Sequence, residues 1–115
     1  MVEAVAMLAT LATTPLALQI LAGLAYALGG AAMKLSQESQ HVAWVGAVYA
    51  CFVVGATLQM RSLKFTSFGT GYVLVLGLEA ALSVGLATMA FGERPGLAQW
   101  GGIAMVVGGA ALLRA

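Results

Sequence analysis

Four long apolar runs, separated by short polar stretches, organise this chain. Their lengths and borders predict helices over residues 15–33, 42–60, 65–91 and 97–113, joined by polar turns at 34–41, 61–64 and 92–96. A helix needs about 20 consecutive apolar residues to cross the hydrocarbon core of a bilayer. The pattern therefore predicts one all-α domain over residues 1–115, an integral membrane protein with four transmembrane helices per protomer.

The first fourteen residues allow two interpretations. The run over 4–33 is uncharged, but Glu3 stands where a signal peptide would carry basic residues, so we interpret it as retained structure. Thr13 or Thr14 can cap a helix that begins at Pro15, because proline suits the first helical turn. Residues 1–14 either lengthen that helix or lie as a short helix at the membrane interface.

The predicted turns are short, so consecutive helices are expected to be antiparallel neighbours. Alternating helices would bring Arg61, Lys64 and Arg114 to one membrane face and Lys34 and Arg94 to the other. This is a weak bias under the positive-inside rule. Either the N-terminus prefers the cytoplasm, or the protein inserts both ways, as an antiparallel homodimer would require.

Composition supports the membrane assignment and excludes several classes of function. Of the 115 residues 62% are hydrophobic and 8% are charged, against about a quarter charged in soluble domains. The net charge of +1 leaves no basic stripe for nucleic acid. One cysteine and one histidine cannot form a disulfide or a metal-ligand cluster, and no nucleophile–base pair is visible. We expect no enzyme, no cofactor and no metal.

Glu79 is the most informative residue. It lies near the midpoint of the predicted third helix, with only apolar residues close to it on either side. A charged side chain at bilayer depth costs about 2.5–3.5 kcal/mol on insertion scales. A carboxyl kept there can bind a proton or a cation but not both comfortably, which is the minimum that proton-coupled exchange requires. The alternative is a protonated carboxyl that hydrogen-bonds two helices together.

Two helix faces carry the other candidate site residues. Tyr72 and Ser83 share a face with Glu79, because spacings of three and four residues return to the same side of a helix. On the first helix Gln19 and Tyr26 share a face with Gly23 and Gly30 and should look inward. Both faces could line a substrate path, and both could equally be helix–helix contacts.

The last apolar run has few groups that could bind a substrate, but its small residues suit contact with a partner helix. Gly101, Ala104 and Gly108 are small residues, and the latter two are four residues apart. Small residues at this spacing let two helices approach closely in lipid. We interpret this face as a dimer interface rather than an intrachain contact.

Short motifs in a fixed order resemble the small multidrug resistance transporters of the drug/metabolite transporter (EamA-like) superfamily. The matching segments, in order, are AYALGGAAMKLS at 25–36, Ser62-Leu63-Lys64, Gly69-Thr70-Gly71-Tyr72, Phe91-Gly92-Glu93-Arg94 and the glycine-rich stretch 101–112. The resemblance covers nearly the whole chain beyond residue 15. It implies a four-helix protomer in the bacterial inner membrane, paired as an antiparallel dimer, that exchanges protons for hydrophobic or guanidinium-like cations.

The chain differs from that family at positions where the family has its functional residues. The family's helix 1 glutamate falls on Tyr26, its helix 3 tryptophan on Val75 and a proline on Ser67, whereas Glu79 occupies a usual glycine position. One hypothesis is that the coupling carboxylate has moved from the first helix to the third. The other is a divergent relative with a different cargo, since subunits that flip lipid-linked sugars share the fold without the helix 1 carboxylate.

The sequence thus predicts a small dimeric transporter that works by alternating access. Glu79 would titrate, with Tyr72, Tyr26, Gln19 and Ser83 along the path and Gly101, Ala104 and Gly108 at the dimer interface. Its partners would be lipid, protons and a small cation or lipid-linked compound, in a homodimer or paired heterodimer. A non-transporting accessory subunit of a larger membrane complex is the alternative of a different class.

Overall fold

The computed structural model of the protein describes residues 1–5 and 15–114, apart from the side chains of Pro15 and Arg114, and over these ranges it holds helices and no strand. The long elements are α2 (Pro15–Ser39), α3 (Val42–Ser62), α4 (Phe68–Phe91) and α5 (Leu97–Arg114). Both alternatives for residues 1–14 depend mainly on residues outside the described ranges.

The predicted helix borders agree with the structure to within two residues except at two places. The first helix continues through Lys34 to Ser39, so the prediction that a turn begins at residue 34 is wrong. This segment contains neither glycine nor proline, and the helix stops only at Gln40, whose φ is 55°. The third long helix begins at Phe68 rather than at residue 65. Residues 63–65 instead extend the end of α3 in a tight turn, in which the Phe65 N–H donates to the Ser62 carbonyl.

Two local features fix helix ends that the sequence left open. His41 caps α3, because its Nδ1 accepts a hydrogen bond from the Ala43 N–H at 3.1 Å. At the end of α4, Gly92 has a φ of 67°, which glycine adopts without a Cβ clash, and the Glu93 N–H donates to the Ala87 carbonyl.

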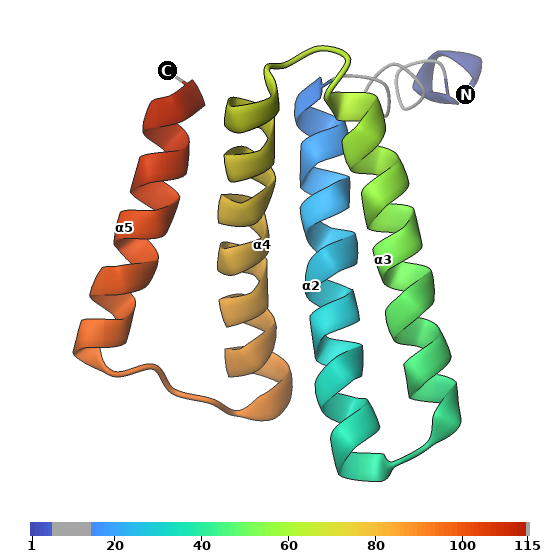
Figure 1. Cartoon of the computed structure of the whole chain (residues 1–115), viewed down its shortest axis with the longest axis vertical. Coiled ribbons are helices and arrows are strands. Elements are labelled where there is room, and N and C mark those ends of the chain that lie inside the picture. Colours follow the sequence, from blue (N-terminus) through green and yellow to red (C-terminus); the bar gives the residue numbers. More distant parts are fainter. Residues whose placement is uncertain (6–14, 115) are drawn as a thin grey trace.

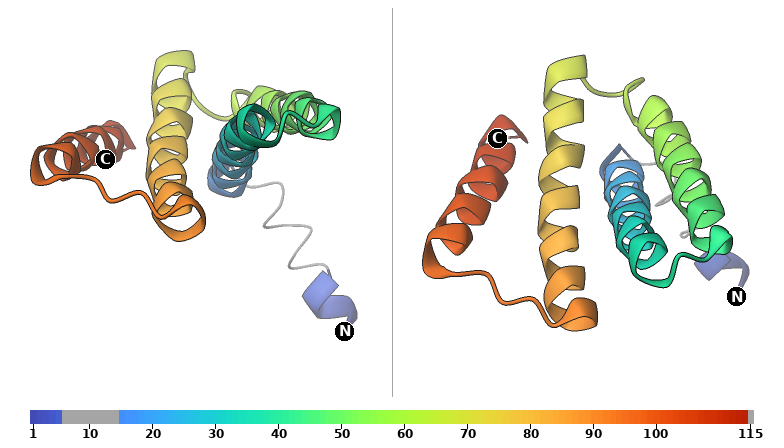
Figure 2. Two further views of the ribbon diagram at one scale, coloured as in Figure 1. Left: turned by 90° about the horizontal axis from the view of Figure 1, so that it is seen from below. Right: turned by 60° about the horizontal axis from the view of Figure 1, so that its bottom comes forward.

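The four helices stand in a row in the order α3, α2, α4, α5 (Figure 1). The helix α2 packs against both α3 and α4, α5 packs against α4, and α3 barely touches α4. The expectation that consecutive helices are neighbours is therefore confirmed for α2/α3 and α4/α5 but wrong for α3/α4. The five residues 63–67 carry the chain past the start of α2, so that α4 lies beside α2 and runs parallel to it (Figures 1 and 2).

Small residues make this row possible. A Cβ at Gly23 of α2 would lie 3.1 Å from the Leu78 Cβ of α4, and a Cβ at Gly29 would meet the Phe52 ring of α3 at 3.0 Å. The buried core is correspondingly thin and consists mainly of α2 alanines together with Leu74 and Val75 of α4. Most large apolar side chains of the described residues point outward.

An outward-facing apolar surface suits a lipid environment. Three stretches are long and apolar enough to cross a bilayer: Leu16–Ser39, Val42–Ser62 and Phe68–Phe91. Leu97–Leu113 is apolar but shorter.

Candidate functional site

The crossing of α2 and α4 positions Glu79. A Cβ at Gly23 would lie 3.3 Å from the Glu79 backbone nitrogen, so the two helices are nearly in backbone contact at this level. Glu79 is the twelfth of the 24 residues of α4, and the helix carries no other charged residue. Its side chain is half-buried. Within the described residues the Glu79 carboxylate makes no hydrogen bond and no ion pair.

Two tyrosines accompany this carboxyl group. Tyr26 of α2 interacts electrostatically with both Tyr72 and Glu79. Tyr72 lies two helical turns before Glu79 on the same face of α4 and is 45% exposed. The structure therefore brings three of the five predicted site residues into one neighbourhood.

Tyr26 is held in place from the α3 side. Its hydroxyl donates a hydrogen bond of 2.8 Å to Oε1 of Gln59. Its ring contacts Gly55, where a Cβ would come within 2.8 Å of the ring, and lies 5.6 Å from the centre of the Phe52 ring. No larger residue would fit at Gly55 without moving the tyrosine.

Gln59 was not among the residues predicted to form the site. This residue is 6% exposed, and its Nε2 has no hydrogen-bond partner in the part of the chain that the structure describes. An amide in an apolar helix is itself a signal, because lipid offers it no partner. We call Tyr26, Gln59, Tyr72 and Glu79 the Glu79 cluster.

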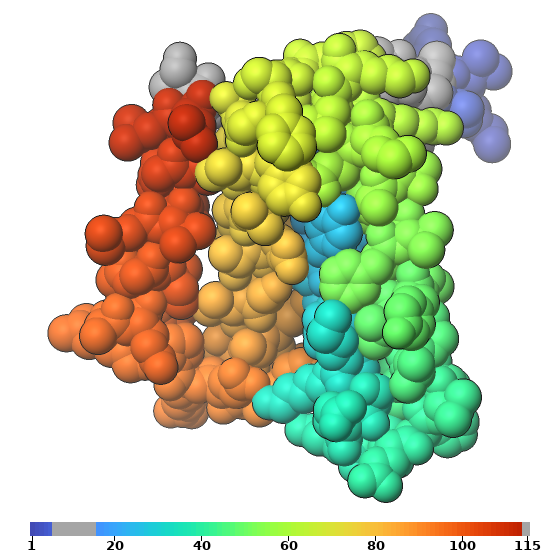
Figure 3. Space-filling model, viewed as in Figure 1, coloured from blue at the N-terminus to red at the C-terminus, as the bar shows by residue number. Residues whose placement is uncertain are grey.

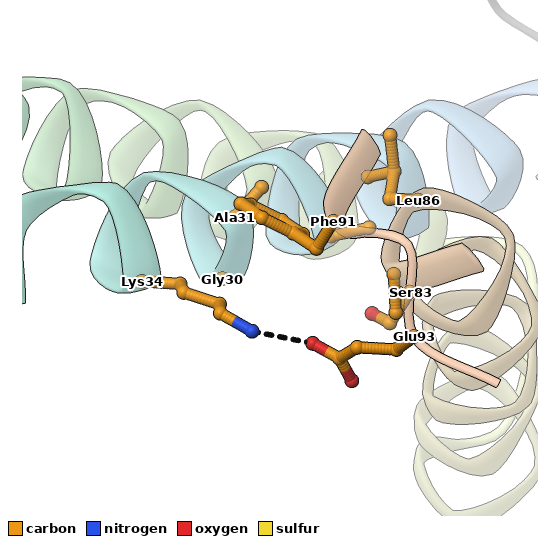
Figure 4. Close-up of a pocket in the computed structure, with 9 residues that line it drawn as sticks. Gly30, Ala31, Lys34, Ser83, Leu86, Phe91 and Glu93 are labelled. Carbon is orange, nitrogen blue, oxygen red and sulfur yellow. Dashed lines mark hydrogen bonds and ion pairs between the residues drawn. The ribbon is translucent and has the colours of Figure 1, made fainter. Parts of the chain in front are cut away.

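Ser83 does not belong to the Glu79 cluster but lines a cavity. It lines a space of about 140 Å³ between the lower halves of α2 and α4, together with Gly30, Phe91, Lys34 and Glu93. The Lys34 Nζ lies 2.5 Å from a Glu93 carboxylate oxygen and 4.8 Å from the centre of the Phe91 ring. Figure 4 shows this ion pair spanning from α2 to the segment after α4. The sequence did not predict this pair, because the two residues are 59 positions apart along the chain.

Gln19 is separated from the Glu79 cluster as well. It is 2% exposed, which confirms that it faces inward, and it lines an apolar cavity of about 180 Å³ between α2, α4 and α5. The α4 residues of this cavity, including Leu74 and Ala81, occupy a different face of the helix from Tyr72 and Glu79. The five predicted site residues thus fall into three places.

The predicted dimer-interface residues stand on the free side of α5. Gly101, Ala104 and Gly108 are exposed, and a Cβ at either glycine would meet nothing within 4 Å. The intrachain contact of α5 is made elsewhere, where a Cβ at Gly77 would come within 2.6 Å of the Ala110 Cβ. Figure 3 shows α4 and α5 touching over their upper part and separating below it.

The described residues contain no group of three or more His, Cys, Asp or Glu side chains that could hold a metal ion. Comparison with protein-family models, with curated proteins and with solved structures gives no significant match to this chain.

Proposed function

We propose that this protein is a four-span membrane protein that acts as a small proton-coupled transporter. The three long apolar helices support the membrane assignment. The 18 residues of α5 extend about 27 Å at 1.5 Å per residue, close to the roughly 30 Å of a hydrocarbon core. With α5 as the fourth span, Glu79 lies at mid-helix, whereas Lys34 lies near the end of α2 and the other charged residues lie at helix ends or in connections and terminal segments.

The observation that carries the transport proposal is the unpaired Glu79 carboxyl group at the middle of α4. An ionisable group at this depth is costly and is usually retained because something binds to it. The surroundings support that role, since Tyr26 and Tyr72 offer two hydroxyls and two ring faces to a cation. A proton and a cationic cargo would compete for the same carboxyl oxygens.

Alternating access needs two arrangements of the helices around this site, and a dimer supplies them. The free small-residue face of α5 supports pairing through Gly101, Ala104 and Gly108. An antiparallel pair would place two Glu79 clusters about one central path in the bacterial inner membrane.

The substitution Glu79→Gln tests this mechanism, because it keeps the shape of the side chain and removes its ability to exchange a proton. Proton-driven uptake of a cationic compound into proteoliposomes should fall to background, with the dimer retained on size-exclusion chromatography. Glu38→Gln, at the exposed end of α2, is the matched control and should transport normally. Undiminished proton-coupled uptake by the Glu79→Gln protein would rule the mechanism out.

The accessory-subunit alternative rests on the missing partner of Glu79. A carboxylate without a cation within the described residues could pair with Lys or Arg of another protein, docked on the open flanks of the row. Purification in mild detergent separates the two proposals. A stoichiometric foreign subunit favours the accessory role, whereas a dimer of this chain alone favours the transporter.

A further inference from the structure

The cavity that contains Gln19 is a second candidate binding site, separate from the Glu79 cluster. Its described lining comes from three helices: Leu16 and Gln19 of α2, Leu74 and Ala81 of α4, and Val107 and Ala111 of α5 are among its residues. Every lining residue except Gln19 is apolar. The space of about 180 Å³ exceeds the roughly 150 Å³ apolar cavity that is known to admit a benzene ring.

The Gln19 amide is the feature that indicates a ligand in this cavity. Its Nε2 is buried and has no hydrogen-bond partner among the described residues, and the whole residue is 2% exposed. Buried donors without a partner are rare in native structures, so each one needs an explanation. Rotation of the amide about its last bond can turn Nε2 into the cavity.

Water is a poor candidate for the missing acceptor. An ordered water in a protein interior needs two to four polar partners, and the described lining offers a single amide. The site instead suits a molecule that is almost entirely apolar and carries one neutral acceptor.

The depth of Gln19 identifies such a molecule. This residue lies four positions after Pro15, the first residue of α2, and therefore about 6 Å along the helix axis from that end. Glycerol ester carbonyls lie at such a shallow depth, just inside the headgroup layer, and the acyl chain continues inward from them. Two of the lining residues, Leu16 and Val107, are exposed, so the cavity can be reached from the surrounding lipid.

We propose that this cavity holds an ester-linked acyl chain of a bilayer lipid, with the ester carbonyl accepting a hydrogen bond from the Gln19 amide. The inference rests on the membrane insertion included in the proposed function, but it does not depend on transport or on Glu79. The bound chain would fill the gap between α4 and α5 and couple the position of α5 to the lipid.

A pair of lipids that differ only in the carbonyl tests the proposal. The protein is exchanged into mixed micelles with diester or diether phosphatidylcholine of the same chains and headgroup, and lipid retention is measured by native mass spectrometry. The wild-type protein should retain the diester lipid about two- to tenfold better, the range that one net hydrogen bond gives. Gln19→Met keeps a similar side-chain volume without the donor and should lose this preference.

A cavity-filling variant tests the location. Ala81→Leu should lower retention of both lipids severalfold, whereas Ala90→Leu, at an exposed position of the same helix, should leave retention unchanged. Equal retention of diester and diether lipid by the wild-type protein, or a preference that survives in Gln19→Met, would overturn the proposal. So would retention by Ala81→Leu equal to that of the wild type. None of these results bears on Glu79→Gln, so failure here and failure of the transport mechanism are distinguishable.

Discussion

Single polar residues in this chain meet an apolar environment in different ways. Gln59 uses one half of its amide to bind the Tyr26 hydroxyl and leaves the other half without a partner. Glu79 has no partner within the described residues and can reduce its cost by taking up a proton. A carboxyl group that is stabilised by binding a proton or a cation can exchange one for the other, and an amide cannot. The transport proposal is therefore centred on Glu79 and not on Gln59.

The Tyr26–Gln59 bond has a measurable structural role. Tyr26→Phe removes the donor but keeps the ring against Gly55 and Phe52. Loss of one net hydrogen bond should lower the free energy of unfolding by about 0.5–1.5 kcal/mol, measured by denaturant titration in detergent. Adding Gln59→Leu removes the stranded amide and should recover part of that loss. A double variant that is no more stable than Tyr26→Phe would contradict this account.

Between helices, glycines set the distances. The helix α4 meets a neighbour on either side at a point with little side-chain volume, Gly23 on the α2 side and Gly77 on the α5 side. These contacts bring backbones close together and compensate for the scarcity of large buried side chains. The contact with α5 is the sparser of the two, since α5 packs on no other described helix.

The Gly77–Ala110 contact leads to a matched set of variants. Gly77→Ala would place a methyl group 2.6 Å from the Ala110 Cβ, which forces α5 away from α4. Overpacking of this kind should lower the free energy of unfolding by about 1–3 kcal/mol in detergent. Gly85→Ala is the control on the same helix, because a Cβ there meets nothing within 4 Å. The pair Gly77→Ala with Ala110→Gly moves the methyl group across the contact and should restore stability; no recovery would show that the contact is not limiting.

At the scale of the whole molecule, an ion pair between Lys34 and Glu93 links two helices of the row. Lys34 belongs to α2, and Glu93 follows α4 in the connection to α5. Exposed ion pairs contribute little to stability. This contact is more useful as evidence that the end of α4 lies beside α2. It also closes one side of the cavity that contains Ser83 (Figure 4).

Zero-length cross-linking tests this arrangement. A carbodiimide joins an amine to a carboxylate only when the two are in direct contact, and the Lys34 and Glu93 side chains lie 2.5 Å apart. We expect an intramolecular amide between peptides containing Lys34 and Glu93, identified by mass spectrometry after proteolysis. Glu93→Gln should abolish this product, and Glu38→Gln should not. Absence of the cross-link in the wild-type protein would contradict the packing of α2 against the end of α4.

The sequence alone predicted the helices and the position of the central acid along its helix. Long uncharged runs bounded by polar residues determine where helices form, so three of the four starts and the ends of the last two agree within about one residue. The position of Glu79 at the middle of its helix follows directly from those borders. The prediction is wrong for residues 34–39 because it placed the end of the helix at the first polar residue. These residues are polar but can form a helix, and α2 continues through them.

Tertiary structure decided which helices meet and which polar residues share a site. In a soluble helix the apolar stripe identifies the packed face, but these helices are apolar on nearly every side, so their periodicity carries little information about neighbours. The helix α4 packs on α2 rather than on α3, and the two helices approach closely at Gly23. That choice brought Tyr26 to Glu79 and left Gln19 and Ser83 in cavities of their own, because a residue's partners depend on helix order in space and not on its position along the chain.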